Sequence, residues 1–156
     1  MKTLVLGLGN DILADDAVGI LAARALKERL GDVADVQETS WHGVALLELF
    51  IGFDRAILLD AVMTGKHAPG TVIEINPDDL APIQGASPHF TGLPEMIAMA
   101  KALELEFPKN FRIFAVEVAD PHTIGGEMTP AVRDAIPAFC DRVCAALGQP
   151  LALKEK

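Results

Sequence analysis

The sequence predicts a single α/β domain with a mixed, mostly parallel central sheet of about five strands and helices on both faces. The chain has 156 residues, which is enough for one domain with a sizeable core. Apolar residues make up 51% of it, few of them aromatic, and short apolar runs alternate with segments of helical periodicity. We therefore expect one domain over residues 1–156, without an internal linker or repeat.

The first half of the chain predicts three strands and two helices. Its first apolar run leads into a glycine-containing turn, and the helix that follows has a natural stop at Gly31. The third strand is apolar almost throughout, which is typical of a central strand buried on both faces. The expected strands cover 3–8, 33–39 and 55–62, and the expected helices cover 15–30 and 44–51.

The second half predicts two further strands and two helices. The connection over 64–70 is too short for a helical crossover, so the strand at 71–75 should pair antiparallel with its neighbour. Thr129-Pro130 is a helix start signal, with a capping hydroxyl and a proline at the first helical position. The remaining expectations are a loop over 76–87, a helix over 93–105, a strand over 111–118 and a final helix ending at 147.

Charge and composition restrict the possible partners and the compartment. The net charge of −9 argues against nucleic acid and anionic membranes as partners, and no apolar run could span a bilayer. The first residues read as a strand, not a secretory signal, because a glycine turn and two acids follow without a cleavage site. Cys140 and Cys144 share one helix face, so we expect buried free thiols and a reducing cytoplasm.

Two adjacent carboxylates, Asp15 and Asp16, follow the first strand and its Gly7-Leu-Gly9 turn. Open α/β sheets bind ligands at the carboxyl ends of their strands. Two acids would repel a phosphate, so this turn should serve a cation or a polar substrate. We expect one of the two to cap the helix and the other to point at the sheet edge.

Asp60 and His89 are the other candidates for chemistry. Asp60 lies in an apolar strand, where a carboxylate is costly unless it is paired, hydrogen-bonded or bound to metal; the plainer interpretation is a cap on a neighbouring turn. His89 alone would be an ordinary loop histidine. If Asp16, Asp60 and His89 meet, two carboxylates and an imidazole suit a divalent transition metal with open coordination positions. The standard signatures of zinc proteases and serine hydrolases are absent.

These residues, in this order, resemble the hydrogenase maturation endopeptidases, which process the large subunit of nickel-iron hydrogenases. The motif from Gly7 to Gly19, the strand ending Leu-Leu-Asp60-Ala and Ser87-Pro-His89 carry the resemblance. Two further segments support it, and the likeness covers nearly the whole chain. The sequence departs from the family in having Asp16 where some members have Glu and Ala17 where Gly is common. The supporting segments are Ala68-Pro-Gly-Thr71 and Gly126-Glu-Met-Thr-Pro130.

The resemblance implies an α/β metal-dependent endopeptidase in which Asp16, Asp60 and His89 bind nickel and carry catalysis. The nickel belongs to the hydrogenase large-subunit precursor, and other divalent metals would be able to substitute. Cleavage removes a short C-terminal extension. Asp16 or Asp60 could serve as general base, since a protease without a nucleophile must activate water. The expected enzyme is a cytoplasmic monomer with no nucleic-acid or membrane partner.

Three other interpretations stay open at this point. A dinucleotide-binding domain is disfavoured because Ile12 stands where the third fingerprint glycine belongs. A receiver-like signalling domain would need the acid pair directly at the strand end and a lysine after the last strand, and neither is present. A non-catalytic nickel chaperone would use the same three ligands.

Overall fold

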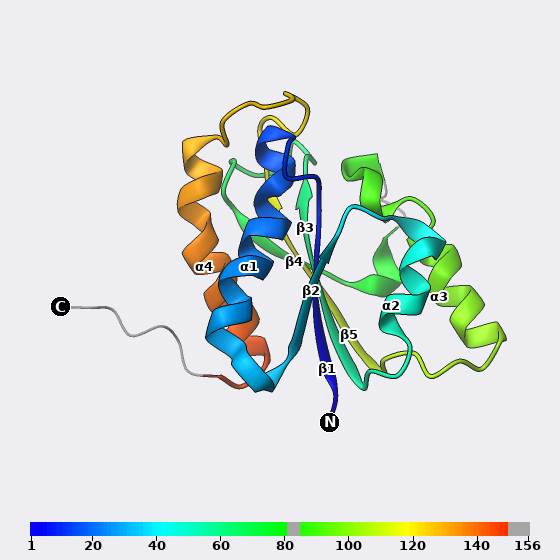
Figure 1. The fold of residues 1–156 in the computed structure, drawn as a ribbon. Coiled ribbons are helices and arrows are strands. Elements are labelled where there is room, and N and C mark those ends of the chain that lie inside the picture. The colour runs from blue at the N-terminus through cyan, green and yellow to red at the C-terminus, as the bar shows by residue number, and fades with distance from the viewer. Residues whose placement is uncertain (81–84, 150–156) are drawn as a thin grey trace.

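The computed structural model describes residues 1–80 and 85–149 and has three layers. Helices α1 and α4 cover one face of the sheet, and α2 and α3 cover the other (Figure 1). The strands are β1 (Thr3–Leu8), β2 (Asp35–Thr39), β3 (Arg55–Val62), β4 (Val72–Ile75) and β5 (Asn110–Glu117). The helices are α1 (Val18–Leu30), α2 (Leu47–Phe50), α3 (Leu93–Ala102) and α4 (Pro130–Ala146).

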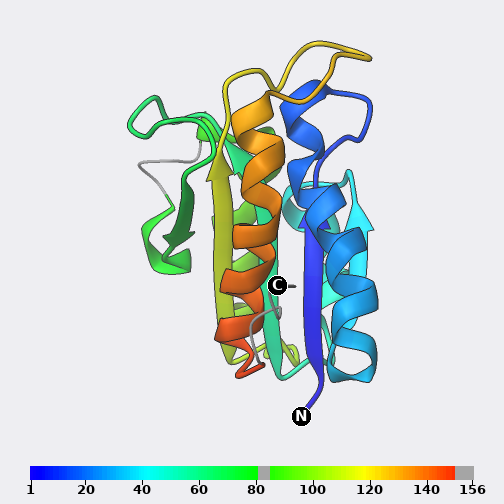
Figure 2. The same cartoon turned by 90° about the vertical axis from the view of Figure 1, so that its left-hand side faces the viewer.

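The sheet has the strand order β2-β1-β3-β5-β4. Strands β2, β1, β3 and β5 are parallel, and β4 runs antiparallel to β5. The predicted fold class is therefore confirmed. All four parallel strands have their carboxyl ends on the side of the sheet opposite the N-terminus, and the loops that follow the strands gather there (Figures 1 and 2).

Strand β4 is antiparallel as predicted, but its partner is β5, which follows it in the sequence. Strand β5 lies between β4 and β3, so β3 and β4 do not pair. Burial explains the arrangement: the last five residues of β5 are buried, whereas only Ile75 of β4 is buried and Glu74 is exposed. A partly exposed, short strand suits the edge of a sheet, and a buried strand suits its centre.

The hydrophobic core is divided by the sheet into two clusters. One packs the sheet against α1 and α4 and contains Val5, Leu26, Ile57 and Phe139. The other packs the opposite face against α2 and α3 and contains Leu6, Leu58 and Met96. Because β3 contributes to both clusters, its residues are fixed from both sides, including those at its carboxyl end.

Several helices and strands begin or end at other residues than predicted, because short 3-10 turns occupy residues that were expected to belong to them. Residues Ala14–Ala17 form such a turn before α1, and Gly31–Val33 form another before β2. The short helix expected over 44–51 is a 3-10 turn followed by the single turn of α2. Helix α3 ends at Ala102, earlier than expected. The expected loop over 76–87 includes residues 81–84, which lie outside the described part of the chain.

Glycines at two positions let α1 lie unusually close to the sheet. A Cβ at Gly7 of β1 would overlap the carbonyl oxygen of Gly19, and a Cβ at Gly19 would overlap the carbonyl oxygens of Leu8 and Leu59. The start of α1 therefore packs directly onto the carboxyl ends of β1 and β3. This contact brings the acidic turn before α1 to the end of β3. None of the helices in the described residues is both long and apolar enough to cross a membrane.

Candidate active site

Asp60 lies near the carboxyl end of β3, opposite Ala115 of β5, and is completely buried. The Ser87 hydroxyl donates a hydrogen bond to its Oδ2 at 2.5 Å. Within the described residues, Asp60 Oδ1 has no hydrogen-bond partner. Burial raises the pKa of Asp60 from 3.8 to about 7, against the opposing effects of His89 and the Ser87 hydrogen bond. The strand thus holds a carboxyl group that is costly to ionise and has one oxygen unused.

Asp16 lies in the 3-10 turn before α1 and is 4% exposed. Its Oδ2 accepts a hydrogen bond from the backbone N–H of Asn10 at 2.9 Å and lies 3.3 Å from His89 Nε2. A Cβ at Gly9 would overlap the backbone carbonyl oxygen of Asp16, so this glycine is needed for the close approach of the two segments. The Gly7–Asp16 motif therefore folds back on itself to present one carboxylate.

His89 lies in a 3-10 turn, Pro88–Phe90, and is 6% exposed. Ser87 caps this turn, since its hydroxyl oxygen accepts a hydrogen bond from the backbone N–H of His89. Burial lowers the pKa of His89, but the hydrogen bond with Asp16 and the charges of Asp60 and Asp16 outweigh it, so the net pKa is raised. The same Ser87 hydroxyl thus contacts both the strand carboxylate and the histidine turn.

The structure brings together all three residues that the sequence singled out. Asp16, Asp60 and His89 each offer one ligand atom, and these atoms lie within 4.8 Å of one another. Two ligands of a tetrahedral metal ion lie about 3.4 Å apart, given bonds of about 2.1 Å. Asp16 Oδ2 and His89 Nε2 lie 3.3 Å apart, close to this spacing, and the unpartnered Asp60 Oδ1 provides a third ligand without losing another bond. The donor set therefore fits a divalent cation.

Asp15 has a different role from its neighbour Asp16. We expected one of the two to cap α1, and neither does. No side chain caps the 3-10 turn or α1. Asp15 is fully buried and accepts hydrogen bonds from the backbone N–H groups of Ala119, Asp120 and Thr129 and from the Thr129 hydroxyl, at 2.6–3.0 Å. It ties the loop after β5 and the start of α4 to the acidic turn, so it supports the site without facing it.

A cleft with a volume of about 160 Å³ opens beside the three residues. Asp16 lies on its wall, and most of its lining is apolar, including Leu13, Met63, Val118 and Pro121. The other histidines (His42, His67 and His122) are exposed, and His122 also borders this cleft. Of the three site residues only Asp16 lines this cleft, so an entering peptide would meet Asp16 through an opening that favours apolar contacts.

Sequence reasoning missed two supporting side chains. Ser87 is one of them, and its signal is the Ser-Pro-His segment itself, because a serine two residues before a candidate ligand is a common turn-capping pattern. Glu117, at the end of β5, is 1% exposed and accepts hydrogen bonds from the backbone N–H groups of Thr64 and Gly65 and from the Thr64 hydroxyl. It holds the loop after β3 in place, and no local signal in the sequence indicates this.

Comparison with known proteins supports one family. The family model of hydrogenase maturation proteases, HycI, matches residues 20–146. The chain is 34% identical to the Hydrogenase 2 maturation protease of Escherichia coli over 153 residues, covering 94% of this chain and 91% of that protein. It is 31% identical to the hydrogenase expression/formation protein HupD of Bradyrhizobium diazoefficiens, covering 95% and 79%.

Solved structures agree with these matches. The hydrogenase maturating endopeptidase HybD from E. coli superposes with a TM-score of 0.81 at 31% identity, covering 95% of this chain and 93% of that one. The hydrogenase maturation protease HybD from Thermococcus kodakarensis has the same fold, with a TM-score of 0.71 at 20% identity and coverage of 94% and 99%. This chain belongs to the hydrogenase maturation protease family.

Proposed function

We propose that this protein is the endopeptidase that removes the C-terminal extension from the large-subunit precursor of a nickel-iron hydrogenase. In this proposal Asp16, Asp60 and His89 contact the nickel that the precursor carries. One observation supports it above the others: three buried metal-binding side chains from separate segments meet beside a cleft in a chain that belongs to a protease family.

The arrangement suits a reaction in which water attacks the peptide bond directly. Both cysteines lie in the core between the sheet and α4, and the Ser87 hydroxyl hydrogen is engaged by Asp60. Bound nickel would polarise a carbonyl group or lower the pKa of a water molecule. Asp60 and Asp16 are the two carboxylates within reach of such a water molecule. The general base is one of these two acids.

Two of the alternatives fall away with the family assignment, namely the dinucleotide-binding and receiver-like domains. The remaining alternative is a protein that binds nickel without cutting, because it would use the same ligands. The free, buried Cys140 and Cys144 are consistent with a reducing cytoplasm. We expect the protein to be monomeric in the absence of the precursor, which size-exclusion chromatography with light scattering checks.

The decisive experiment incubates the purified protein with the cognate precursor, with and without nickel loading, and measures intact masses. We expect loss of a C-terminal peptide only from the nickel-loaded precursor. Precursor loaded with another divalent metal, such as zinc or cobalt, tests whether other metals substitute. Each of Asp16→Asn, Asp60→Asn and His89→Ala should reduce cleavage by more than about 100-fold, since loss of a supporting partner alone costs 10–100-fold at metal sites.

Asp32→Asn is the matched control, because Asp32 is an exposed acid. It lies in the turn between α1 and β2, at the amino ends of the strands and so far from the site. It should cleave like the wild type. Nickel-dependent binding without cleavage would favour the chaperone. Cleavage that ignores nickel, or that persists in all three site variants, would refute the proposed role of these residues.

A further inference from the structure

Asn10 lies in the loop between β1 and the acidic turn, and the proposed reaction gives its polar side chain no role. We propose that the side-chain amide of Asn10 donates a hydrogen bond to the carbonyl oxygen of the peptide bond that is cleaved. This assignment rests on the proposed function and adds a catalytic residue to the site. It follows from the position of Asn10, the direction of its amide group and the charge of its surroundings.

Asn10 contacts one of the three candidate ligands, Asp16, and lines a neighbouring hollow of about 220 Å³. Its backbone N–H donates to Asp16 Oδ2 at 2.9 Å, and its carbonyl oxygen accepts from the N–H of Leu13 at 3.1 Å. The backbone of Asn10 is therefore in direct contact with a carboxylate of the site. Leu13 and Asp16 both line the cleft through which a peptide would enter.

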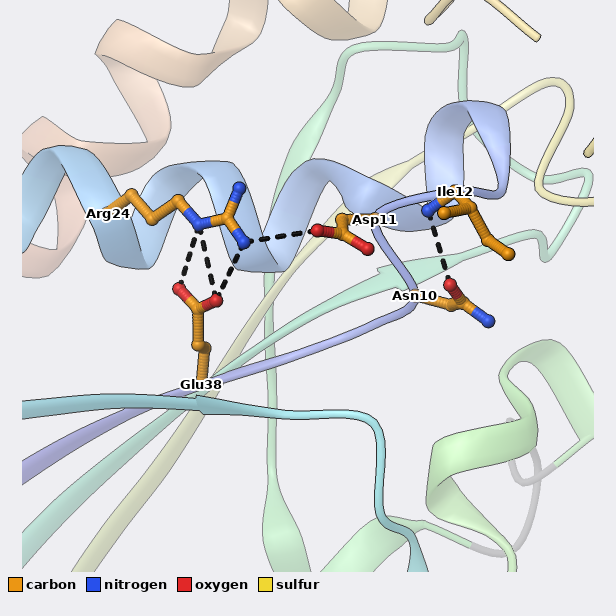
Figure 3. Close-up of polar contacts among 5 residues, drawn as sticks. All are labelled: Asn10, Asp11, Ile12, Arg24 and Glu38. Atoms are coloured by element: carbon orange, nitrogen blue, oxygen red, sulfur yellow. Dashed lines mark hydrogen bonds and ion pairs between the residues drawn. The ribbon is translucent and has the colours of Figure 1, made fainter. Parts of the chain in front are cut away.

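The amide of Asn10 is oriented by its own acceptor atom. Its Oδ1 accepts a hydrogen bond from the backbone N–H of Ile12 at 3.2 Å, so the oxygen side of the amide is engaged in the turn. Nδ2 has no acceptor in the described residues, and Figure 3 shows it turned away from Arg24 and Glu38. The side chain is half-buried, so a substrate can reach this donor.

The loop is held firmly enough to keep this donor in place. Arg24 of α1 bridges Glu38 of β2, at 2.8–3.2 Å, and Asp11 of the loop, at 3.1 Å (Figure 3). The N–H of Gly9 also donates to the carbonyl oxygen of Thr39 at 3.2 Å. The residues on both sides of Asn10 are thus tied to neighbouring elements, and a donor fixed before the reaction needs no reorganisation.

The chemistry of hydrolysis requires such a donor. When the oxygen of water adds to the carbonyl carbon, the carbonyl oxygen takes the electron pair and becomes negative. The C–N bond then breaks, the carbonyl re-forms in the new carboxyl terminus, and the proton removed from water passes to the leaving amine nitrogen. Asp16 and Asp60 would repel the negative oxygen. The Ser87 hydrogen is already engaged by Asp60, whereas the Asn10 amide is neutral and unused.

Two variants test the assignment with nickel-loaded precursor. Asn10→Asp keeps an oxygen that can accept from Ile12 N–H but loses the NH₂ donor, and Asn10→Ala removes the side chain without adding charge. Each should lower kcat by about 100–1,000-fold, the usual cost of losing one oxyanion donor, while KM changes much less. Precursor binding, measured separately, should persist in Asn10→Ala.

Asn76, which follows the end of β4, offers a matched control. Its side-chain oxygen likewise accepts a hydrogen bond from the backbone N–H two residues later, that of Asp78, at 2.9 Å. Asn76→Asp should leave kcat unchanged. Full kcat in either Asn10 variant would overturn the assignment while leaving the proposed function intact. A wild-type protein that does not cleave the precursor would overturn the proposed function, and this assignment with it.

Discussion

Replacing Asp60 by asparagine should stabilise the nickel-free protein at pH 8 although it removes a residue of the proposed site. The pKa of Asp60 is about 7 in the folded protein, against 3.8 without the surrounding structure, and burial is the main cause. Each pKa unit corresponds to about 1.4 kcal/mol. The charged carboxylate therefore destabilises the fold by about 4 kcal/mol once the pH is well above 7.

The net gain is smaller than this figure because asparagine adds a buried NH₂ group. Its oxygen can still accept from Ser87, but a buried donor without a partner costs about 1–3 kcal/mol. We expect Asp60→Asn to raise the free energy of unfolding at pH 8 by about 1–3 kcal/mol. The variant should nevertheless be inactive, so activity and stability move in opposite directions.

The raised pKa of Asp60 makes the stability of the protein depend on pH. Because the folded-state pKa is raised, the folded protein binds a proton between about pH 4 and 7 that the unfolded chain does not bind. This contribution to stability is fully present below about pH 4 and is lost as the pH rises through 7. The stability difference between Asp60→Asn and wild type should accordingly grow in favour of the variant from pH 5 to pH 8.

Urea unfolding followed by circular dichroism, with a chelator present and at several pH values, measures this difference. Asp15→Asn is the matched control, because Asp15 is equally buried but accepts four hydrogen bonds. There the new NH₂ group would face N–H donors, so this variant should lose about 2–4 kcal/mol. The reasoning fails if Asp60→Asn is less stable than wild type at pH 8, or if the difference does not depend on pH.

Two further predictions concern the support of the site. Ser87→Ala removes the donor to Asp60 and the acceptor for the His89 N–H, so it should lower the free energy of unfolding by about 1–3 kcal/mol. It should also raise the pKa of Asp60 further, which NMR titration of the carboxyl carbon would detect. An unchanged pKa would contradict this prediction. Gly19→Ala should destabilise by about 1–3 kcal/mol or more, because its Cβ would overlap backbone oxygens of β1 and β3, whereas Gly85→Ala, with open space around its Cβ, should be nearly neutral in thermal unfolding.

Much of the fold could be predicted from the sequence because its signals are local. Apolar runs and helical spacing depend on residues close together in the chain, and they located β1, β3 and α4 closely. The boundaries of α2 and β2 were less accurate because 3-10 turns and regular helices share similar composition. The position of β4 could not be predicted, since it depends on β5, which lies more than thirty residues further along the chain.

The chain by itself singled out Asp16, Asp60 and His89 as candidates for the chemistry, because Asp60 interrupts an apolar strand and the resemblance to the protease family joins it to Asp16 and His89. Only the tertiary structure decided that Asp16 faces the site while Asp15 anchors a loop, and that Ser87 joins the strand to the histidine turn. The physical reason is that adjacent residues in a helical turn point in different directions. The partners of each are supplied by segments that meet only after the sheet has formed.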